Sequence, residues 1–577
     1  MESFSKVYVK ATDRHGFFGV NGGYFHTLLV CREIIETALQ TVQAYRMSSL
    51  LPRTLLNRFY VMLLAANCWS SVIVYSAFFK GDEARRRFVC IVLDCVLDLM
   101  SCMGVELMIL LSYSSDYVVE IQGFWGFLWQ NEQWTARALN EFRMVVVVSW
   151  SDLISRAFFS FGLVLTTTNM KELLEHVPRK SNQVTESVPK DDANVHNKTR
   201  EMCWGSNLDS AKATSVMPQL DLLPPRSNIN LRSHIRRHLL RTVHLLFAAW
   251  GLVVLGLHIH ASVQPSLPQC LMQVRPWTSS RPSCYLVGLD CHTLAISGKS
   301  DEVEDKFSEF DGSTVVQLLI RHCSALEMVG SINEFHGVRG IKVYNSTIVD
   351  WGESAAITNT NHPEIVSLYV VRTNMTGGVL PAGLQSIDFP RNLYDIEICV
   401  TNLNSLPDDL DLKWNHNSII QVEYGQLLNV PSVLLQLEPT TLSVSGNPIT
   451  EIPAEVFELP NLLTLKISEM NIDELPRNVT YVTSSLYWMC LRNTNISLFW
   501  SWIDQLVKAG MTFVVAKGSP YCIDLERIQS GTSNTFSVSS SPEHSPILMD
   551  PSETNLQTIL SFIYCGEYDQ LFYFLLG

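Results

Sequence analysis

Residues 463–476 read LTLKISEMNIDELP, and the spacing of their apolar residues changes halfway along. Leu463, Leu465 and Ile467 alternate with polar residues, which is typical of a half-buried β-strand. Ile472 and Leu475 then follow at a different interval. The stretch is either one strand entering a turn or one copy of a repeating unit. Self-similarity at a fixed period distinguishes the two interpretations.

The same arrangement recurs upstream in LYDIEICVTNLNSLP, SIIQVEYGQLLNVP and TLSVSGNPITEIP, and its strand part recurs downstream in SLYWMCLRNTNIS. Aligning the copies places an apolar strand residue every 22 to 28 residues, with a second one two positions before it. The aligned pairs are Leu318/Ile320, Ile341/Val343, Leu368/Val370, Ile396/Ile398, Ile420/Val422, Leu442/Val444, Leu465/Ile467 and Met489/Leu491. Unrelated loops would rarely produce this agreement, so residues 315–507 are predicted to form repeats.

The pattern L-x-x-L-x-L-x-x-N-x-L, closed by L-x-x-L-P, resembles the leucine-rich repeat family, most specifically from Leu393 onward. The resemblance implies an α/β solenoid with a concave sheet. The chain departs from the family at the asparagine position, which Asn447 occupies. Other residues replace it in the other copies, namely Ser346, Thr373, Thr401, Gly425, Met470 and Thr494. We therefore expect a solenoid with an incomplete asparagine ladder.

Charge is distributed unevenly along the chain, whose formal net charge is −14. Residues before Gln264 include 26 basic and 22 acidic side chains, and the remainder includes 16 basic and 34 acidic ones. The acidic second half argues against nucleic acid as a partner, because a duplex ligand requires a basic face.

Four segments of the first half are predicted to cross a bilayer, since a spanning helix needs roughly 20 apolar residues. They are 59–79, 88–113, 144–168 and 243–263; buried helices of a soluble domain are the alternative. Residues 1–58 show no signal peptide and contain a predicted amphipathic helix. The expected fold is a membrane bundle of about four α-helices followed by an α/β leucine-rich repeat solenoid.

Basic residues in short loops set the expected orientation, because cytoplasmic loops are enriched in Lys and Arg. Two such groups fall on the same side of the four segments, and they predict an extracellular position for residues 264–577. The groups are Lys80, Arg85, Arg86 and Arg87, and Arg232, Arg236, Arg237 and Arg241. The second group is also expected to bind anionic lipid headgroups. Arg46, Arg53 and Arg58 oppose this orientation, because they would lie outside as well.

Two further patterns favour an extracellular repeat domain. N-glycosylation triplets begin at Asn345, Asn374, Asn478 and Asn495. Cys270, Cys284 and Cys291 precede the repeats and Cys522 follows them, where extracellular leucine-rich repeat proteins carry cysteine-stapled caps. Residues 264–314 are the predicted N-terminal cap. Residues 508–577 hold the C-terminal cap, a Ser/Pro-rich linker and an apolar tail expected to dock on the repeat end. The sequence leaves the cysteine pairing open.

Residues 169–242 form a polar insert that is predicted to be a largely disordered cytoplasmic loop. Charged residues also interrupt the apolar segments: Asp94, Asp98 and Glu106 in the second, and Asp152 and Arg156 in the third. A charge at mid-bilayer costs roughly 2.5–3.5 kcal/mol, so these side chains should face the bundle interior. One interpretation is an ion pair in which Arg156 bridges Asp152 and an aspartate of the second segment. The other is a path for cations or protons.

Catalytic signatures such as a phosphate-binding loop, a zinc-protease helix, a nucleophile elbow or a kinase motif set are absent from the sequence. The chain is expected to be a non-enzyme that uses neither cofactor nor metal. Function is predicted on the concave face of the repeats, because Tyr and Arg dominate binding hot spots. The predicted anchors for a protein or glycan ligand of basic character are Arg321, Tyr344, Tyr369, Arg372 and Tyr424.

The order of the parts resembles leucine-rich repeat membrane proteins of oomycetes, on the stretches AYRMSSLLPRTLLNRFYVMLLAANCWSSVIV and RFVCIVLDCVLDLM. This resemblance implies an architecture and no particular activity. A receptor-like or adhesion role is predicted from the extracellular position of the repeats and from their concave face. The layout is also similar to volume-regulated anion channels, so a channel or transporter subunit is the alternative. In those channels the repeats are cytosolic and the long loop lies between spans two and three. Here the long loop lies between the third and fourth segments.

Overall fold

The computed structural model describes residues 25–77, 83–125, 128–129, 131–148, 150–175, 227–510 and 512–566. The chain divides into two compact units. Unit 1 contains Met1–Leu39, Leu63–Cys102 and Ile154–Val254, and unit 2 contains Gln40–Met62, Met103–Leu153 and Leu255–Gly577. Most of the predicted disordered insert, residues 176–226, lies outside the described residues. The two ends of that insert are helical.

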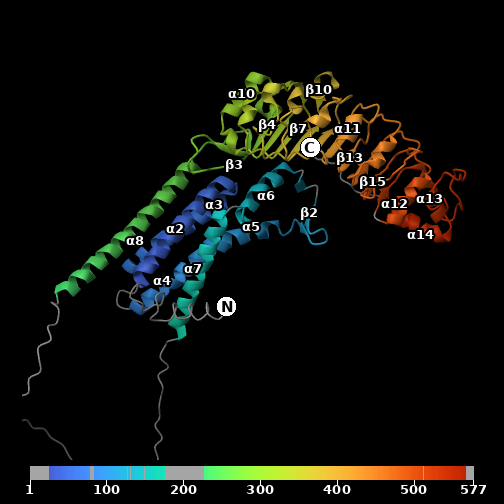
Figure 1. The fold of residues 1–577 in the computed structure, drawn as a ribbon. Helices are drawn as coiled ribbons and strands as arrows, with labels where there is room; N and C mark the ends of the chain where they lie inside the picture. Colours follow the sequence, from blue (N-terminus) through green and yellow to red (C-terminus); the bar gives the residue numbers. More distant parts are fainter. Residues whose placement is uncertain are drawn as a thin grey trace, which may run out of the picture. The chain divides into compact units, whose positions relative to one another are not determined.

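The N-terminal region is helical (Figure 1). Its helices are α2 (Phe25–Leu50), α3 (Thr54–Ala77), α4 (Glu83–Leu99), α5 (Val105–Tyr113), α6 (Glu132–Val145), α7 (Trp150–Glu175) and α8 (Ser227–Ser262). A π-helical turn, Met100–Gly104, joins α4 to α5. A short hairpin of β1 (Tyr117–Val118) and β2 (Gly123–Phe124) precedes α6, whose first turn is capped by the Asn131 side chain.

Two described helical stretches, Phe88–Tyr113 and Arg241–Ser262, are long and apolar enough to cross a membrane. They match the predicted segments 88–113 and 243–263. The predicted segments 59–79 and 144–168 fall in α3 and α7, but within the described residues neither of these helices meets the same measure of length and hydropathy. Helix α7 begins only at Trp150, and the backbone at Val146, within the predicted segment, is extended. The expectation of about four membrane-length helices is therefore confirmed for two.

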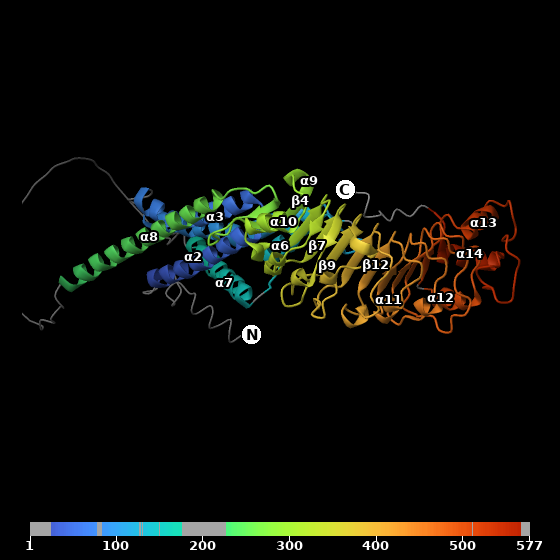
Figure 2. The ribbon, with the colours of Figure 1, turned by 90° about the horizontal axis from the view of Figure 1, so that it is seen from above.

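The second region is a solenoid built on one twelve-stranded sheet (Figures 1 and 2). Its strands are β3 (Cys270–Val274), β4 (Ser283–Asp290), β5 (Gln317–Arg321), β7 (Gly340–Tyr344), β9 (Ser367–Val371), β11 (Asp395–Cys399), β12 (Ile419–Glu423), β13 (Thr441–Ser443), β14 (Thr464–Lys466), β15 (Trp488–Cys490), β16 (Phe513–Val515) and β17 (Ile563–Tyr564). Only β3 and β4 are antiparallel; from β4 to β17 each strand is parallel to its neighbour. The register follows the predicted repeats, with Ile320 beside Val343 and Val343 beside Val370.

The sixteen apolar repeat positions all face the core, and none is more than 1% exposed. Between strands the chain returns through α10 (Ser300–Ser308), α11 (Ser432–Gln436) and short 3₁₀ turns. A small second sheet of β6 (Leu326–Glu327), β8 (Thr347–Asp350) and β10 (Asn374–Met375) accompanies the first repeats. One continuous apolar core joins all copies. The predicted α/β repeat solenoid is confirmed, with two further strands at each end of the eight predicted ones.

Each copy turns sharply at the same position after its strand. The residue two places after the second strand position has a positive φ, between 44° and 71°, in all eight copies, and it is a glycine only at Gly446. The next position is the asparagine position, where the Asn447 amide donates to the carbonyls of Val422 at 2.7 Å and Val444 at 2.8 Å. In another copy a hydroxyl at this position bonds to the backbone of the neighbouring copy: Ser346 Oγ accepts a hydrogen bond from the N–H of Cys323 at 3.1 Å. The asparagine ladder is thus incomplete, as expected.

Disulfides close both ends of the solenoid, which confirms the predicted cysteine-stapled caps. The pairs are Cys270–Cys284, Cys291–Cys323 and Cys522–Cys565. At the C-terminal end, α12 (Asp504–Ala509) and α13 (Pro520–Gln529) precede α14 (Glu553–Phe562), which leads into β17. The predicted docking of the apolar tail on the repeat end holds as far as Gly566, and residues 567–577 lie outside the described residues.

Unit 2 also contains chain segments from the N-terminal region that pack on the first strands of the solenoid. Ala136 of α6 packs against Leu286 of β4 and Leu319 of β5, and Glu132 of α6 forms an ion pair with Lys342 of β7. The end of α2 makes similar contacts, since Tyr285 donates a hydrogen bond to the Ser49 carbonyl and the Tyr45 hydroxyl lies 3.2 Å from Thr278 Oγ1. The solenoid therefore rests directly on α6 and on residues 45–50.

Candidate functional site

The predicted anchors lie along neighbouring strands of the sheet. Arg321 ends β5, Tyr344 ends β7 and Tyr369 lies within β9, while Arg372 and Tyr424 occupy the positive-φ positions after β9 and β12. The three tyrosines pack against one small cluster formed by Val371 and Cys399. Sequence alternation had placed Tyr344 and Tyr369 on one face, and the structure brings Tyr424 to the same cluster.

Arg372 joins this cluster through Tyr344. Its Nη1 donates to the Tyr344 hydroxyl at 3.2 Å, and the guanidinium carbon lies 5.9 Å from the centroid of the tyrosine ring. This geometry combines a cation–π contact with a hydrogen bond. Arg372 remains exposed, so its side chain is accessible to a ligand. We name Tyr344, Tyr369, Arg372 and Tyr424 the anchor surface.

Arg321 has a different role, because it is held by Asp290 at the end of β4. Arg321 Nε donates to Asp290 Oδ2 at 3.0 Å, and His322 Nδ1 lies 3.1 Å from Asp290 Oδ1. Asp290 also caps the short helix α9 (Cys291–Leu294) by accepting from the N–H groups of His292 and Thr293. Burial alone would raise the pKa of Asp290, but the hydrogen bonds from His322 and Thr293 and the charge of Arg321 lower it.

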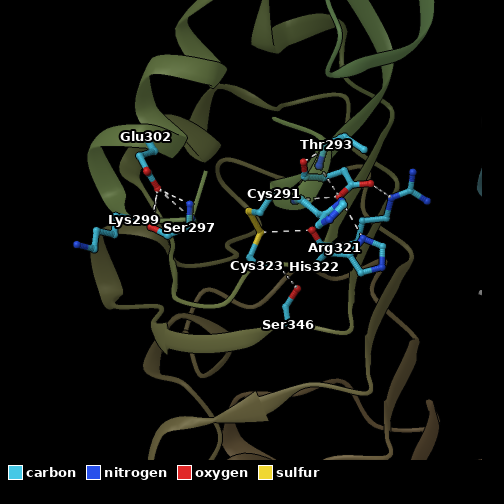
Figure 3. The surroundings of a disulfide bond; sticks show 12 residues. Cys291, Thr293, Ser297, Lys299, Glu302, Arg321, His322, Cys323 and Ser346 are labelled. Carbon is cyan, nitrogen blue, oxygen red and sulfur yellow. Dashed lines mark hydrogen bonds and ion pairs between the residues drawn. A yellow bond between two sulfur atoms is a disulfide. The ribbon is translucent and has the colours of Figure 1, made fainter. Parts of the chain in front are cut away.

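The Asp290 network is part of the first disulfide-closed corner of the solenoid. Figure 3 shows Arg321 and His322 beside the Cys291–Cys323 disulfide, with Ser346 of the next copy close by. Sequence reasoning missed both Asp290 and Cys323. Cys323 stands at the asparagine position of the first copy, so its alignment with Asn447 was the signal that could have identified it.

A groove opens beside the anchor surface, at the carboxyl ends of the first repeat strands. Its volume is about 580 Å³, within the usual range for ligand sites. His292, His322, Asn345, Arg372 and Asn374 contribute to its lining. It therefore combines two imidazoles and a guanidinium, which can donate hydrogen bonds to an oxygen-rich ligand.

Two of the four predicted glycosylation sites, Asn345 and Asn374, line this groove, and the others, Asn478 and Asn495, lie on later copies. All four side chains are exposed, as a glycosylation acceptor requires. The Asn495 amide donates to Asn471 Oδ1 at 2.6 Å.

The middle of the concave face carries a buried polar network in which Tyr369 is the one predicted anchor. Tyr369 donates to Asp395 Oδ2 at 2.7 Å, and the Gln421 amide donates to Glu397 Oε1 at the same distance. Lys466 Nζ lies 3.0 Å from Gln421 Oε1. Burial, together with the charges of Asp395 and Glu423, raises the pKa of Glu397 to about 8. Acidic residues at concave positions of two consecutive copies, Glu397 and Glu423, were the available signal.

The charged residues of the apolar helices find partners on α2. Asp152 forms an ion pair with Arg46, and Asp94 forms one with Arg32, which also bonds Glu36 at 3.1 Å. Sequence analysis had assigned no pairing role to α2, and the proposed bridge through Arg156 stays a prediction, as does the role of Glu106.

Carboxylate oxygens of Glu36, Asp94 and Asp98 converge within 4.8 Å of one another. Arg32 forms ion pairs with Glu36 and Asp94, so two of these three carboxylates already have a counter-charge. The four arginines expected to bind lipid headgroups all lie on α8: Arg232, Arg236, Arg237 and Arg241.

No protein-family model matches this chain, and no curated protein matches it. Its fold is similar to that of solved leucine-rich repeat structures. A leucine-rich repeat protein of Leptospira interrogans is 18% identical, with a TM-score of 0.30, over 41% of this chain and 56% of the other. TLR13 in the TLR13–ssRNA13 complex is 9% identical, with a TM-score of 0.29, over 37% of this chain and 33% of the other. These similarities concern the fold of the repeats alone.

Proposed function

We propose that this chain is a non-enzymatic multi-pass membrane protein whose repeat domain lies outside the cell and binds a protein or extended glycan ligand. The observation that carries the binding role is the anchor surface, where three tyrosines and an exposed arginine adjoin a groove of about 580 Å³. Aromatic rings and guanidinium groups give large contact areas and directed hydrogen bonds, so they supply much of the energy at protein interfaces.

Exposed apolar side chains support insertion into a membrane. On the stretch Phe88–Tyr113, Leu107 is 54% and Leu111 is 61% exposed, and on Arg241–Ser262 both Leu245 and Leu246 are 65% exposed. Contact between water and so much apolar surface is unfavourable by about 25 cal/mol per Å². Lipid chains remove that cost, which favours a bilayer as the surroundings of these helices.

The contacts within unit 2 support four crossings. Residues 45–50 and α6 each contact the first part of the solenoid, so all three lie on the same side of the membrane. A chain that crosses in Phe88–Tyr113 and again in Arg241–Ser262 must then cross twice more. One of these additional crossings falls between residue 50 and residue 88, and the other between α6 and residue 241. Helices α3 and α7 occupy those two intervals.

The three disulfides and four exposed glycosylation triplets favour an extracellular solenoid, because both modifications belong to the secretory pathway. Arg46, Arg53 and Arg58 are the one argument against that orientation. Two of them form ion pairs within unit 2, Arg46 with Asp152 and Arg53 with Glu141 at 2.7 Å.

The orientation is tested by glycosidase treatment of intact cells that express the full chain. We expect faster migration on a gel after treatment, and Asn→Gln substitution of Asn345, Asn374, Asn478 and Asn495 together should abolish the change. A domain without glycans that resists external protease until the cells are permeabilised would contradict the proposal.

The binding role is tested by screening the displayed full chain against secreted proteins and glycans. For a ligand so found, Tyr344→Ala and Arg372→Ala should each lower affinity by about 30-fold or more, as truncation of hot-spot residues does. Tyr394→Ala is the matched control, because Tyr394 is 53% exposed and lies outside the anchor surface. Equal affinity in all variants would refute the role of this surface.

A channel or transporter subunit remains the second candidate, and one observation favours it. Glu36, Asp94 and Asp98 place three carboxylates within 4.8 Å of one another on helices of the N-terminal region. Altered ion conductance of an Asp98→Asn variant, with normal amounts at the cell surface, would support this function. Unchanged or absent conductance would favour the structural network.

A further inference from the structure

The β1–β2 hairpin carries a group of exposed apolar side chains. Tyr117 of β1, Val119 and Ile121 of the turn, and Trp125 directly after β2 are each at least 46% exposed, and Val119 is 74% exposed. We name these four residues the hairpin surface. Apolar side chains gathered at exposed positions mark surfaces that contact a membrane or another protein.

Aromatic side chains fix the hairpin to the adjoining ends of α5 and α6. Phe124 of β2 packs edge-on against Trp134 of α6, with ring centroids 5.2 Å apart, and against Tyr113, the last residue of α5, at 6.5 Å. Trp134 Nε1 donates a hydrogen bond to Asp116 Oδ2 at 2.9 Å, directly before β1. The hairpin surface is therefore held in place by packed rings, which leave its own four side chains exposed.

Helix α6 separates the hairpin from the solenoid. Trp134 contacts the hairpin, whereas Ala136 packs against β4 and β5. Residues two apart on an α-helix point about 200° apart, so these contacts lie on opposite faces of α6. Glu132 and Glu141 follow the same division, because Glu132 forms an ion pair with β7 and Glu141 accepts a hydrogen bond from Tyr113 at 2.9 Å. The hairpin thus lies on the face of α6 that is turned toward α5 and away from the first solenoid strands.

The surroundings of α5 indicate what covers the hairpin surface. Leu107 and Leu111 of α5 are 54% and 61% exposed, and α5 belongs to the membrane-length stretch Phe88–Tyr113. Only Ser114–Asp116 lie between this stretch and the hairpin, so a bilayer that surrounds α5 ends beside the hairpin.

The composition of the hairpin also suits the membrane–water interface. Tryptophan and tyrosine concentrate there, because each combines an apolar ring with a polar group. Residues 114–136 contain neither lysine nor arginine, the side chains that attract anionic headgroups. Zwitterionic lipid is therefore the partner that fits this surface.

We propose that the hairpin surface inserts into the headgroup region of the leaflet on the solenoid side. Apolar faces that lie in a membrane interface are buried about 5–10 Å into it. Because the opposite face of α6 carries β4 and β5, this insertion holds the base of the solenoid at the bilayer surface. The contact with lipid depends on the membrane location proposed for α5, and it does not involve the anchor surface.

Quenching of tryptophan fluorescence by brominated lipid measures this contact. The full chain is reconstituted into phosphatidylcholine bilayers whose acyl chains carry bromine either near the headgroup or near the methyl end. The contribution of Trp125 is the difference between the native chain and Trp125→Phe. Bromine near the headgroup should quench this contribution more strongly than bromine near the methyl end, because an interfacial side chain lies at shallow depth.

Trp250 of α8 separates failure of the hairpin contact from failure of the proposed membrane location. It is 44% exposed and lies near the middle of the stretch Arg241–Ser262. Its contribution, obtained with Trp250→Phe, should show the reverse order of quenching. Quenching of Trp250 without quenching of Trp125 would refute the hairpin contact alone. Absence of quenching at both residues would refute the membrane location, and the hairpin contact with it.

Two double variants separate insertion of the hairpin from general damage. Val119→Asp with Ile121→Asp should remove most of the quenching of Trp125, because it places charge where the hairpin enters the membrane. Ile387→Asp with Leu412→Asp is the matched control, because these solenoid residues are 87% and 77% exposed. The control should leave the quenching of Trp125 unchanged. An unchanged near-ultraviolet circular dichroism spectrum verifies that the aromatic rings remain packed in both variants.

Two further outcomes would assign the hairpin surface to another occupant and overturn the proposal. Aqueous iodide in place of brominated lipid would then quench Trp125. Loss of iodide quenching as the protein-to-lipid ratio rises would identify a second copy as the cover. Loss of iodide quenching only after addition of a secreted protein would identify an external partner.

Discussion

The helical region and the solenoid place their apolar side chains in opposite ways. In the solenoid the sixteen repeat positions are at most 1% exposed, whereas Leu107 and Leu111 of α5 are 54% and 61% exposed. Buried charges occur in both regions, since the Asp94 side chain is 13% exposed in its pair with Arg32 and the Asp290 side chain is 8% exposed in its pair with Arg321. The solenoid also carries exposed pairs, and Glu364 is 55% exposed in its pair with Arg339. The comparison teaches that hydrophobic content alone does not distinguish the two regions; the direction of the side chains does.

Breaking a charged pair in each region should give the largest difference. Arg32→Leu would leave Asp94 close to Glu36 and Asp98 without its counter-charge, and we expect a loss of about 3–5 kcal/mol of stability. Arg339→Leu removes an exposed pair and should cost about 1 kcal/mol or less. The amount of folded full chain at the cell surface and its unfolding temperature in detergent measure both effects. Equal effects of the two substitutions would contradict the greater burial of the Arg32–Asp94 pair.

The same leucine-to-arginine substitution in each region sharpens the comparison. Leu110 of α5 is 45% exposed and Leu463 of the solenoid is 48% exposed, so the two sites have similar access. Leu110→Arg should disturb insertion by about 2.5–3.5 kcal/mol if lipid surrounds α5. Leu463→Arg should be tolerated, because water surrounds it. Membrane-fraction yield and protease resistance report the outcome, and a tolerated Leu110→Arg would mean that α5 faces water.

An effect that is small at each pH step and spread over several pH units is a pH dependence of the solenoid from Glu397. Because its folded-state pKa is raised to about 8, its stabilising contribution is present below the unfolded pKa and is lost as the pH rises through about 8. Between these pH values Glu397→Gln should flatten the curve of unfolding free energy against pH by about 1 kcal/mol per pH unit.

Glu302 provides a control for this pH dependence, because its pKa is shifted in the opposite direction. Hydrogen bonds from Ser297 lower its pKa, so its contribution should be lost as the pH falls. A Glu397→Gln variant with the same pH profile as the unchanged chain would show that Glu397 is not buried in solution.

Part of the candidate site could be predicted, because strand alternation is a local rule. Tyr344 and Tyr369 were found by their spacing from Val343 and Val370, and the structure places both on the anchor surface. Asp290 could not be found in this way, because β4 precedes the first repeat and has no copy with which to align. The burial of Cys399 could not be predicted either, because strand alternation places its side chain on the concave face, which is expected to be exposed to solvent.

The sequence by itself determined the solenoid, its register and the positions of its core. In each copy the two apolar strand residues, such as Leu465 and Ile467, pack against the equivalent residues of the next copy. A repeat period of 22 to 28 residues is therefore enough to predict the register of the strands. Only the tertiary structure decided the pairing of Cys291 with Cys323, the partnership of Arg32 with Asp94 and the contact of α6 with β5. These contacts join residues that share no period. They depend on where whole elements pack, and the local spacing of side chains does not record that packing.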